Sequence, residues 1–328
     1  MSGIRRREFI VALGGAAAWP LPGRAQQPAM PTVGFLHGMS PASHAPYVAA
    51  FRQGLKDTGY VDEQNLAIEY RWAEGQYARL PALAVDLVHR KVAVIAATGG
   101  TATARAAKAA STLIPIVFVT ADDPVETGLV ASLNRPGGNL TGVSIISAAL
   151  RAKNLELLHE LVPTAVVAIL VNPDNPAIEN QVKDAQLAAS TLGKTIHLLT
   201  ARTEQDIDAA FSSLIQKHTG ALIVSTDPFF VARRDQLVAL AARHAVPTVY
   251  FLREFVTAGG LMSYGTSLTE ANRLSGIYAG RLLKGEKPAE LPVQQSSKVE
   301  LVINLKTAKA LGLTFPITLL GRADEVIE

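Results

Sequence analysis

VFVTADDPVETG, residues 117–128, joins an apolar run to two aspartates, a proline and a glutamate. The β-branched apolar run predicts a buried strand, and Asp123 followed by Pro124 predicts a helix with Asp123 as its N-cap. A strand followed directly by a helix is the unit of a parallel α/β sheet. The three acids could hold a metal, act in acid–base chemistry, bind the amine of a ligand, or start the helix.

The same alternation of apolar runs and helical periods extends along the rest of the chain. Strands are predicted over residues 32–36, 66–72, 92–97, 114–119, 140–144, 166–171, 195–199, 221–225, 248–251, 261–264 and 299–303. Helices are predicted over residues 45–58, 79–90, from about 101, 150–161, 177–192, 204–217, 230–244 and 268–284.

A mature chain of about 300 residues exceeds the usual size of one hydrophobic core. We therefore predict two lobes, each a doubly wound parallel α/β sheet, joined by a hinge of several strands. Lobe 1 is assigned to residues 31–144 with 258–292, and lobe 2 to residues 145–257 with 293–328.

Residues 1–25 have the features of a signal peptide. Residues 5–7 are arginines, and the uncharged run 9–21 is shorter than a membrane-spanning helix. Small residues then predict cleavage near Ala25. The Arg6-Arg7 pair favours the twin-arginine route over general secretion, and a buried N-terminal helix or a retained anchor is the alternative. We expect an exported, periplasmic protein.

The charge and the cysteine content exclude several classes of protein. The formal net charge is +3, and residues 1–25 contribute +3 through four arginines and one glutamate, so the mature chain is near 3 − 3 = 0. No basic run remains to bind nucleic acid. The absence of cysteine excludes disulfides, thiolate metal sites, cysteine nucleophiles and a lipid-anchored N-terminus.

In an open α/β sheet, ligands bind beyond the carboxyl ends of the strands. Here these ends carry small polar side chains or bare backbone N–H groups at the starts of helices, which suit a carboxylate. The candidates are His37, Thr98, Gly99, Gly100, Thr101, Thr120, Ala121, Asp122, Asn172, Thr226 and Asp227. For Thr98–Thr101 the alternative is an ordinary helix start with Thr101 as N-cap.

No enzyme motif is complete. Residues 142–146 lack the second glycine of a nucleophile elbow, and residues 99–102 lack the end of a P-loop and the glycine spacing of a dinucleotide site. The seven histidines form no paired metal-ligand set, so we predict no metal or other cofactor and no enzymatic activity. Asp122 is then the acid expected to face a ligand, whereas the helix start explains Asp123 and Glu126.

Several long stretches resemble the substrate-binding proteins of ABC importers, in the tryptophan/tyrosine-type branch with a type I periplasmic-binding fold. They are residues 123–130, 135–142, 253–256 with 259–265, 299–308 and 322–325, so the resemblance extends over essentially the whole mature chain. It implies two α/β lobes that close on one small solute and dock on a membrane permease.

The resemblance also implies roles for residues. In relatives that take amino acids, groups after the third and fourth strands hold the carboxylate, and an acid in the cleft holds the amine. Thr98–Thr101 and Thr120–Asp122 occupy those places here; Asp227 and Glu254 are further candidate acids, and Tyr264 is expected to pack on the solute. We expect a monomeric receptor that closes on a small carboxylate-bearing solute such as an amino acid. The alternative is a two-lobed ligand sensor that presents its bound form to a signalling receptor.

Overall fold

The computed structural model describes residues 30–145, 148–295 and 299–328. Within them, Pro31–Glu328 belong to one compact unit. The predicted signal peptide, residues 1–25, lies outside the described residues. Among the described helices, none is long and apolar enough to span a membrane.

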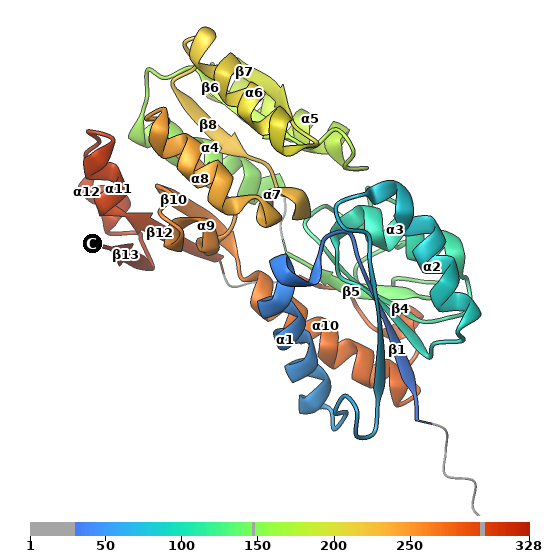
Figure 1. Cartoon of the computed structure of the whole chain (residues 1–328). Coiled ribbons are helices and arrows are strands. Elements are labelled where there is room, and N and C mark those ends of the chain that lie inside the picture. Colours follow the sequence, from blue (N-terminus) through green and yellow to red (C-terminus); the bar gives the residue numbers. More distant parts are fainter. Residues whose placement is uncertain (1–29, 146–147, 296–298) are drawn as a thin grey trace, which may run out of the picture. The chain divides into compact units, whose positions relative to one another are not determined.

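The first sheet has six strands, all parallel, in the order β11-β5-β4-β3-β1-β2 (Figure 1). Its strands are β1 (Thr32–His37), β2 (Ala67–Trp72), β3 (Val94–Ala97), β4 (Ile116–Thr120), β5 (Leu140–Ser144) and β11 (Gln294–Gln295). Its helices are α1 (Pro41–Asp57), α2 (Leu80–His89), α3 (Gly100–Ala110) and α10 (Leu268–Leu283). We call the part of the chain built on this sheet lobe 1.

Alternate side chains of each lobe 1 strand pack on opposite faces, because successive residues of a strand point to opposite sides. Val33 and Phe35 of β1 pack with α1 and α10, which lie side by side. Leu36, whose side chain points to the opposite face of the sheet, packs with α2 and α3. Because helices cover both faces of the sheet, the sequences of its strands are nearly continuous apolar runs.

The second sheet has seven strands in the order β13-β12-β10-β9-β8-β6-β7 (Figure 1). Its strands are β6 (Val167–Val171), β7 (Ile196–Thr200), β8 (Ala221–Val224), β9 (Thr248–Tyr250), β10 (Met262–Thr266), β12 (Val299–Asn304) and β13 (Glu325–Ile327). Its helices are α4 (Ala148–Leu161), α5 (Ile178–Thr191), α6 (Glu204–Gln216), α7 (Pro228–Ala232), α8 (Arg234–Arg243), α9 (Arg253–Thr257), α11 (Leu305–Ala310) and α12 (Ile317–Leu320). This part is lobe 2. The predicted two-lobed α/β architecture is confirmed, with the addition that β10 and β12 pair antiparallel.

The lobe boundaries near the C-terminus differ from the sequence assignment. Residues 258–292 were assigned to lobe 1, but β10 pairs with β9 and β12 in the lobe 2 sheet, so the chain returns to lobe 1 only between Thr266 and Leu268. Residues 293–328 were assigned to lobe 2, but β11 pairs with β5 of lobe 1. The Gly259-Gly260 turn marks a change of element, and pairing between distant strands decides to which sheet the next element belongs.

Two predicted helices also differ. Residues after Pro124 form a turn rather than a helix: Asp123 Oδ1 accepts from Val125 N (2.7 Å), and the turn ends at Gly128, whose φ is +69°. Asp123 therefore caps a turn. The helix predicted over residues 230–244 is divided into α7 and α8 at Arg233.

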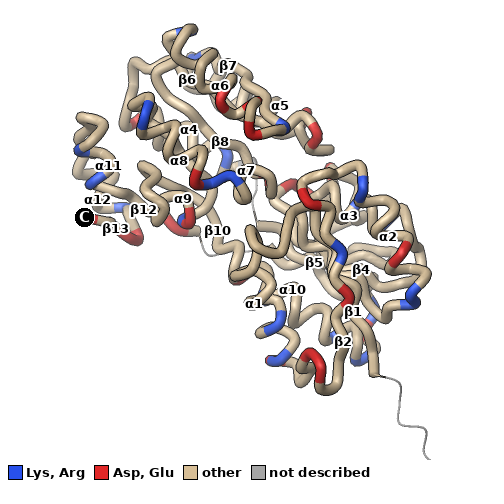
Figure 2. Tube along the Cα trace, viewed as in Figure 1, with Lys and Arg blue, Asp and Glu red and all other residues tan. Residues whose placement is uncertain are grey.

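Charged residues of both signs are interspersed along both lobes (Figure 2). This distribution accompanies the near-zero net charge of residues 26–328.

Candidate ligand-binding site

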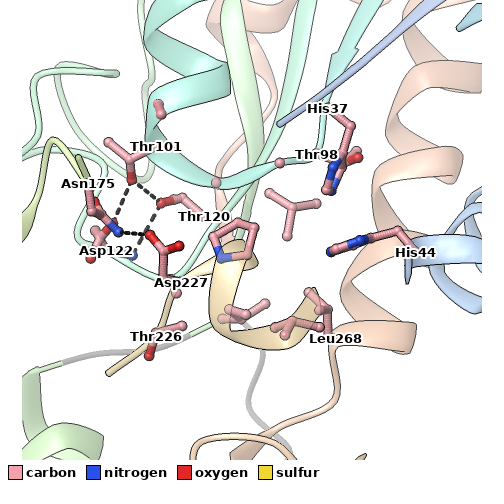
Figure 3. A pocket seen from close by; sticks show the side chains of 18 of the residues that line it. His37, His44, Thr98, Thr101, Thr120, Asp122, Asn175, Thr226, Asp227 and Leu268 are labelled. Carbon is pink, nitrogen blue, oxygen red and sulfur yellow. Dashed lines mark hydrogen bonds between the residues drawn. The ribbon is translucent and has the colours of Figure 1, made fainter. Parts of the chain in front are cut away.

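A cavity lies at the carboxyl ends of β1, β3 and β4 of lobe 1 and of β8 of lobe 2 (Figure 3). The predicted residues that line it are His37, Thr98, Gly99, Gly100, Thr101, Thr120, Ala121, Asp122, Thr226 and Asp227. The lining residues that sequence reasoning missed are His44, Tyr77, Ala102, Val119, Ile145, Asn175, Pro228, Val231, Phe251, Leu268 and Asn272. The rule that ligands bind beyond strand ends therefore located the cavity, but not the side chains that reach it from helices.

The N-terminus of α3 opens on the cavity. Gly99 is the N-cap and makes no side-chain cap, so the first N–H groups of the helix have no side-chain acceptor from that residue. Gly100 has φ +81°, a conformation that side chains rarely adopt, and a Cβ there would also meet Pro228 Cγ of lobe 2 at 3.3 Å. A bare backbone and the positive helix end form a place for an anion. The alternative reading, with Thr101 as N-cap, does not hold, because Gly99 is the N-cap and Thr101 lies inside the helix.

Asp122 is buried in a network of hydrogen bonds. Thr101 Oγ1 donates to Asp122 Oδ2 (2.7 Å), and Gln181 Nε2 of α5 donates to Asp122 Oδ1 (2.9 Å). Thr101 Oγ1 lies 2.7 Å from Thr120 Oγ1, which accepts from Asp122 N. A carboxylate offers about four acceptor sites, so Asp122 can accept further hydrogen bonds from a ligand.

Both carboxylate oxygens of Asp227 accept hydrogen bonds from the protein, and the residue is only 1% exposed. Oδ1 accepts from Tyr77 Oη (3.1 Å), Asn172 Nδ2 (3.1 Å) and Phe229 N (2.8 Å), and Oδ2 accepts from Asn175 Nδ2 (2.8 Å). Burial raises the pKa of Asp227 to about 6, and these hydrogen bonds act against that rise. The residue caps α7, and its four hydrogen bonds to the protein leave it less acceptor capacity than Asp122 has.

Two histidines form the other end of the cavity. The ring centroids of His37 and His44 are 4.2 Å apart, and both side chains are buried. Burial holds the pKa of His37 well below its usual range and lowers the pKa of His44 to about 4. Both rings are therefore neutral at physiological pH.

Hydrogen bonds join the two lobes around the cavity. Tyr77 of lobe 1 donates to Asp227 of lobe 2, and Gln181 of lobe 2 donates to Asp122 of lobe 1. Arg151 Nη1 of α4, whose guanidinium also pairs with Asp184, donates to the carbonyl of Ala121 (3.4 Å). These contacts hold the lobes together over the cavity.

Three predicted ligand contacts do not line the cavity. Asn172 lies behind Asp227 and hydrogen-bonds to it. Glu254 lies in the first turn of α9, beside Tyr47, and its burial raises its pKa. Tyr264 of β10 packs against the apolar core of lobe 2, and its carbonyl accepts from Asn154. Glu254 hydrogen-bonds to Tyr47 and Tyr264 packs on the lobe 2 core, and neither residue is among those that line the cavity.

Few features of the sequence indicate the lining residues that were not predicted. Asn175 follows strand β6 in the segment Asn172–Pro176, which was recognised as a turn but not as a source of ligand contacts. His44 and Gln181 lie on helices, and helical periodicity does not tell which residue of a buried face reaches a cavity. In the part of the chain that the structure describes, no group of three His, Cys, Asp or Glu side chains could hold a metal.

The fold and the cavity between two lobes define the class: a periplasmic-binding-type solute receptor. The model of the family described as ABC transporter substrate binding protein matches residues 34–327, so the chain belongs to that family. A curated relative, the tyrosine-binding protein of Clostridioides difficile, is 30% identical over 264 residues, which are 80% of this chain and 75% of the relative. Family membership favours transport over the sensor alternative.

Two solved structures show different states of relatives. An ABC domain from Streptococcus pneumoniae in complex with L-Trp is 26% identical, with a TM-score of 0.82, over 90% of this chain and 99% of that chain. A ligand-free, open substrate-binding protein from Clostridium difficile is 25% identical over the same shares, with a TM-score of 0.64. At nearly equal identity, this chain is more similar to the ligand-bound relative, in keeping with its interlobe hydrogen bonds. The type I periplasmic-binding fold is confirmed.

Proposed function

We propose that this protein binds an α-amino acid with a large, mainly apolar side chain and presents it to its ABC permease. The observation that carries this proposal is the pairing, at one end of the cavity, of the bare α3 N-terminus with Asp122, which has acceptor capacity left over. An anion site beside a carboxylate matches the carboxylate and ammonium groups of an amino acid.

The middle of the cavity is apolar and suits a side chain. Val119, Ile145 and Leu268 line it from lobe 1 and the adjoining crossing segments, and Val231 and Phe251 line it from lobe 2. Burying an apolar side chain there contributes about 25 cal/mol per Å² of surface removed from water. The relatives described as tyrosine-binding and as bound to L-Trp support an aromatic side chain.

The proposal extends to location and assembly. Residues 1–25 direct export, cleavage falls near Ala25, and the mature protein acts in the periplasm as a monomer. Its partners are the solute and the inner-membrane permease, and no cofactor or catalytic step takes part.

A thermal-shift and calorimetry screen of the twenty common amino acids tests this function. A ligand at 100 times its Kd stabilises the native state by about 2.7 kcal/mol, which raises the melting temperature. We expect one or a few amino acids with large side chains to do so. The proposal is wrong if no amino acid shifts the melting temperature while other small solutes do.

Asp122→Asn probes the ammonium contact. Loss of a charge-assisted hydrogen bond is worth about 1.5–3 kcal/mol, so Kd should rise by about tenfold or more in calorimetry. Asp123→Asn is the matched control, since Asp123 is the neighbouring acid but caps an exposed turn, and its Kd should stay within about twofold of wild type. Equal effects of the two substitutions would exclude Asp122 as the ammonium partner.

A further inference from the structure

The end of the cavity opposite Asp122 carries three buried side chains with unused hydrogen-bonding atoms. His37, His44 and Thr98 all belong to lobe 1, and they are 4%, 3% and 5% exposed. Figure 3 shows them together, across the cavity from Asp122 and Asp227. Thr98 Oγ1 is buried and has no hydrogen-bond partner among the described residues, so this end of the cavity has polar capacity that the protein itself does not use.

The hydrogen bonds of the two histidines fix the tautomer of His37 and make that of His44 depend on Ser43. The backbone N–H of Met39 donates to His37 Nδ1 (3.0 Å), so in the neutral ring the proton is on Nε2. Ser43 Oγ lies 3.1 Å from the carbonyl oxygen of Ser40 and 2.8 Å from His44 Nδ1, and its single proton can go to either. With the proton on the Ser40 side, His44 Nδ1 donates to Ser43 Oγ and His44 Nε2 is a bare acceptor; with the proton toward His44 Nδ1, His44 Nε2 carries the ring proton.

The two rings thus offer His37 Nε2–H, a donor, and His44 Nε2 to the same space, and a hydroxyl group can partner His44 Nε2 in either tautomer because it both donates and accepts. Their centroids are 4.2 Å apart, and both rings line the cavity. Within residues 30–145, 148–295 and 299–328, neither Nε2 atom takes part in a hydrogen bond. Burial keeps both rings uncharged, so they suit a neutral group better than a second carboxylate or an amine.

We propose that His37 and His44, with Thr98, recognise a neutral hydroxyl group at the tip of the solute's side chain. His37 Nε2–H donates to the hydroxyl oxygen, and the hydroxyl proton goes to His44 Nε2. This inference rests on the proposed function, because it requires the amino-acid head at Asp122 and the apolar middle of the cavity. The class of ligand that satisfies both ends is an α-amino acid with a phenol side chain.

A site built to hydrogen-bond a hydroxyl rejects the analogue that lacks it, because the buried polar atoms are then left unpaired. Wild-type protein should therefore bind L-tyrosine at least about tenfold more tightly than L-phenylalanine in calorimetry. In His44→Phe, which keeps an aromatic ring but removes the acceptor, this preference should fall to about twofold or less, with L-phenylalanine affinity within about threefold of wild type.

Two further variants keep the test independent of folding defects. Thr98→Val keeps the side-chain shape, and Ser43→Ala leaves His44 in place but removes the acceptor that orients its tautomer. Both should reduce the preference for L-tyrosine, by about threefold each, without weakening L-phenylalanine binding. His89→Phe on the exposed end of α2 is the matched control and should leave the preference unchanged.

The outcomes separate the two proposals. Wild-type binding of both amino acids with equal affinity, or an unchanged preference in folded His44→Phe and Ser43→Ala, overturns the histidine-pair inference and leaves the proposed function intact. If no amino acid binds to the wild-type protein, the proposed function fails and this inference fails with it.

Discussion

The two polar ends of the cavity use their side chains differently. At the acid end, Asp227 accepts four hydrogen bonds from the protein itself, and Asp122 accepts two. At the histidine end, His37, His44 and Thr98 each keep an atom without a protein partner in the described part of the chain. The protein therefore uses most of the acceptor sites at the acid end, where Asp122 keeps capacity for a ligand, whereas at the histidine end the atoms left over are uncharged.

The two ends also differ in which lobes they involve. Donors from opposite lobes meet at the acid end, where Tyr77 reaches Asp227 and Gln181 reaches Asp122. The histidine end is built within lobe 1 alone. We expect changes at the acid end to affect stability and closure, and changes at the histidine end to affect selectivity and pH dependence.

Asp227→Ala is the strongest test of the acid end. It leaves Tyr77, Asn172 and Asn175 without their buried acceptor, and removing one partner of a buried network costs about 3–5 kcal/mol. Urea denaturation of the ligand-free protein should show a loss of this size. Asp174→Ala, at a half-exposed position nearby, should change stability by about 0.5 kcal/mol or less. Equal losses for the two variants would contradict a structural role for Asp227.

Acidification tests the histidine end. The pKa of His44 is lowered from 6.5 to about 4, so the unfolded chain takes up a proton that the folded chain does not, and stability is lost as pH falls below 6.5. For His44 alone this loss is about 2 kcal/mol between pH 7 and pH 4.5.

The raised pKa of Asp227 acts in the opposite direction. Its folded carboxyl binds a proton near pH 6 whereas the unfolded one does so near 3.8, so stability rises as pH falls through that window. Comparing wild type with His44→Phe cancels this contribution, since Asp227 is present in both. Denaturation curves at pH 7 and 4.5 should show a smaller acid loss in the variant; equal losses would mean that His44 does not stay neutral.

Gln181→Leu gives the smallest expected effect and tests closure. Gln181 is buried and donates to Asp122 and to the carbonyl of Thr226, so its loss removes a link between the lobes. We expect Kd for the amino acid to rise by about five- to tenfold, mainly through faster dissociation in stopped-flow measurements.

Gln186 is an exposed residue that follows Gln181 on α5, so Gln186→Leu is the matched control. It should leave both rate constants unchanged. If Gln181→Leu changes only the association rate, or nothing, the hydrogen bond to Asp122 does not stabilise the closed form.

Much of the fold followed from short-range patterns. Apolar runs and helical periods predicted most strands and the long helices, although not β11, β13, α9 or α12. Thr203 and Asp206 form a capping box that starts α6. The ends of β1, β3, β4 and β8 correctly indicated where the cavity lies, because the carboxyl ends of parallel strands meet at one edge of a sheet. Each of these rules depends only on residues close together in the chain.

Where these short-range rules failed, contacts between different segments of the chain determined the structure. β10 belongs to lobe 2 because it pairs with β9 and β12, and no local sequence pattern indicates with which strands a given strand pairs. Asp227 lines the cavity, as its position after a strand predicts, but its hydrogen bond from Tyr77, 150 residues away in the chain, could not be predicted from local sequence. His44 gave no signal on its helix, and only the packing of α1 beside β1 brings it next to His37.

The sequence by itself determined the alternation of elements, the edge of the sheets where the cavity lies and the family. Local periodicity, capping and motif spacing are sufficient for these, since they act within one or two turns or strands. The tertiary structure decided which strand belongs to which lobe, which acids the protein occupies and which histidine atoms remain free. Those outcomes depend on hydrogen bonds and burial between segments that only folding brings together.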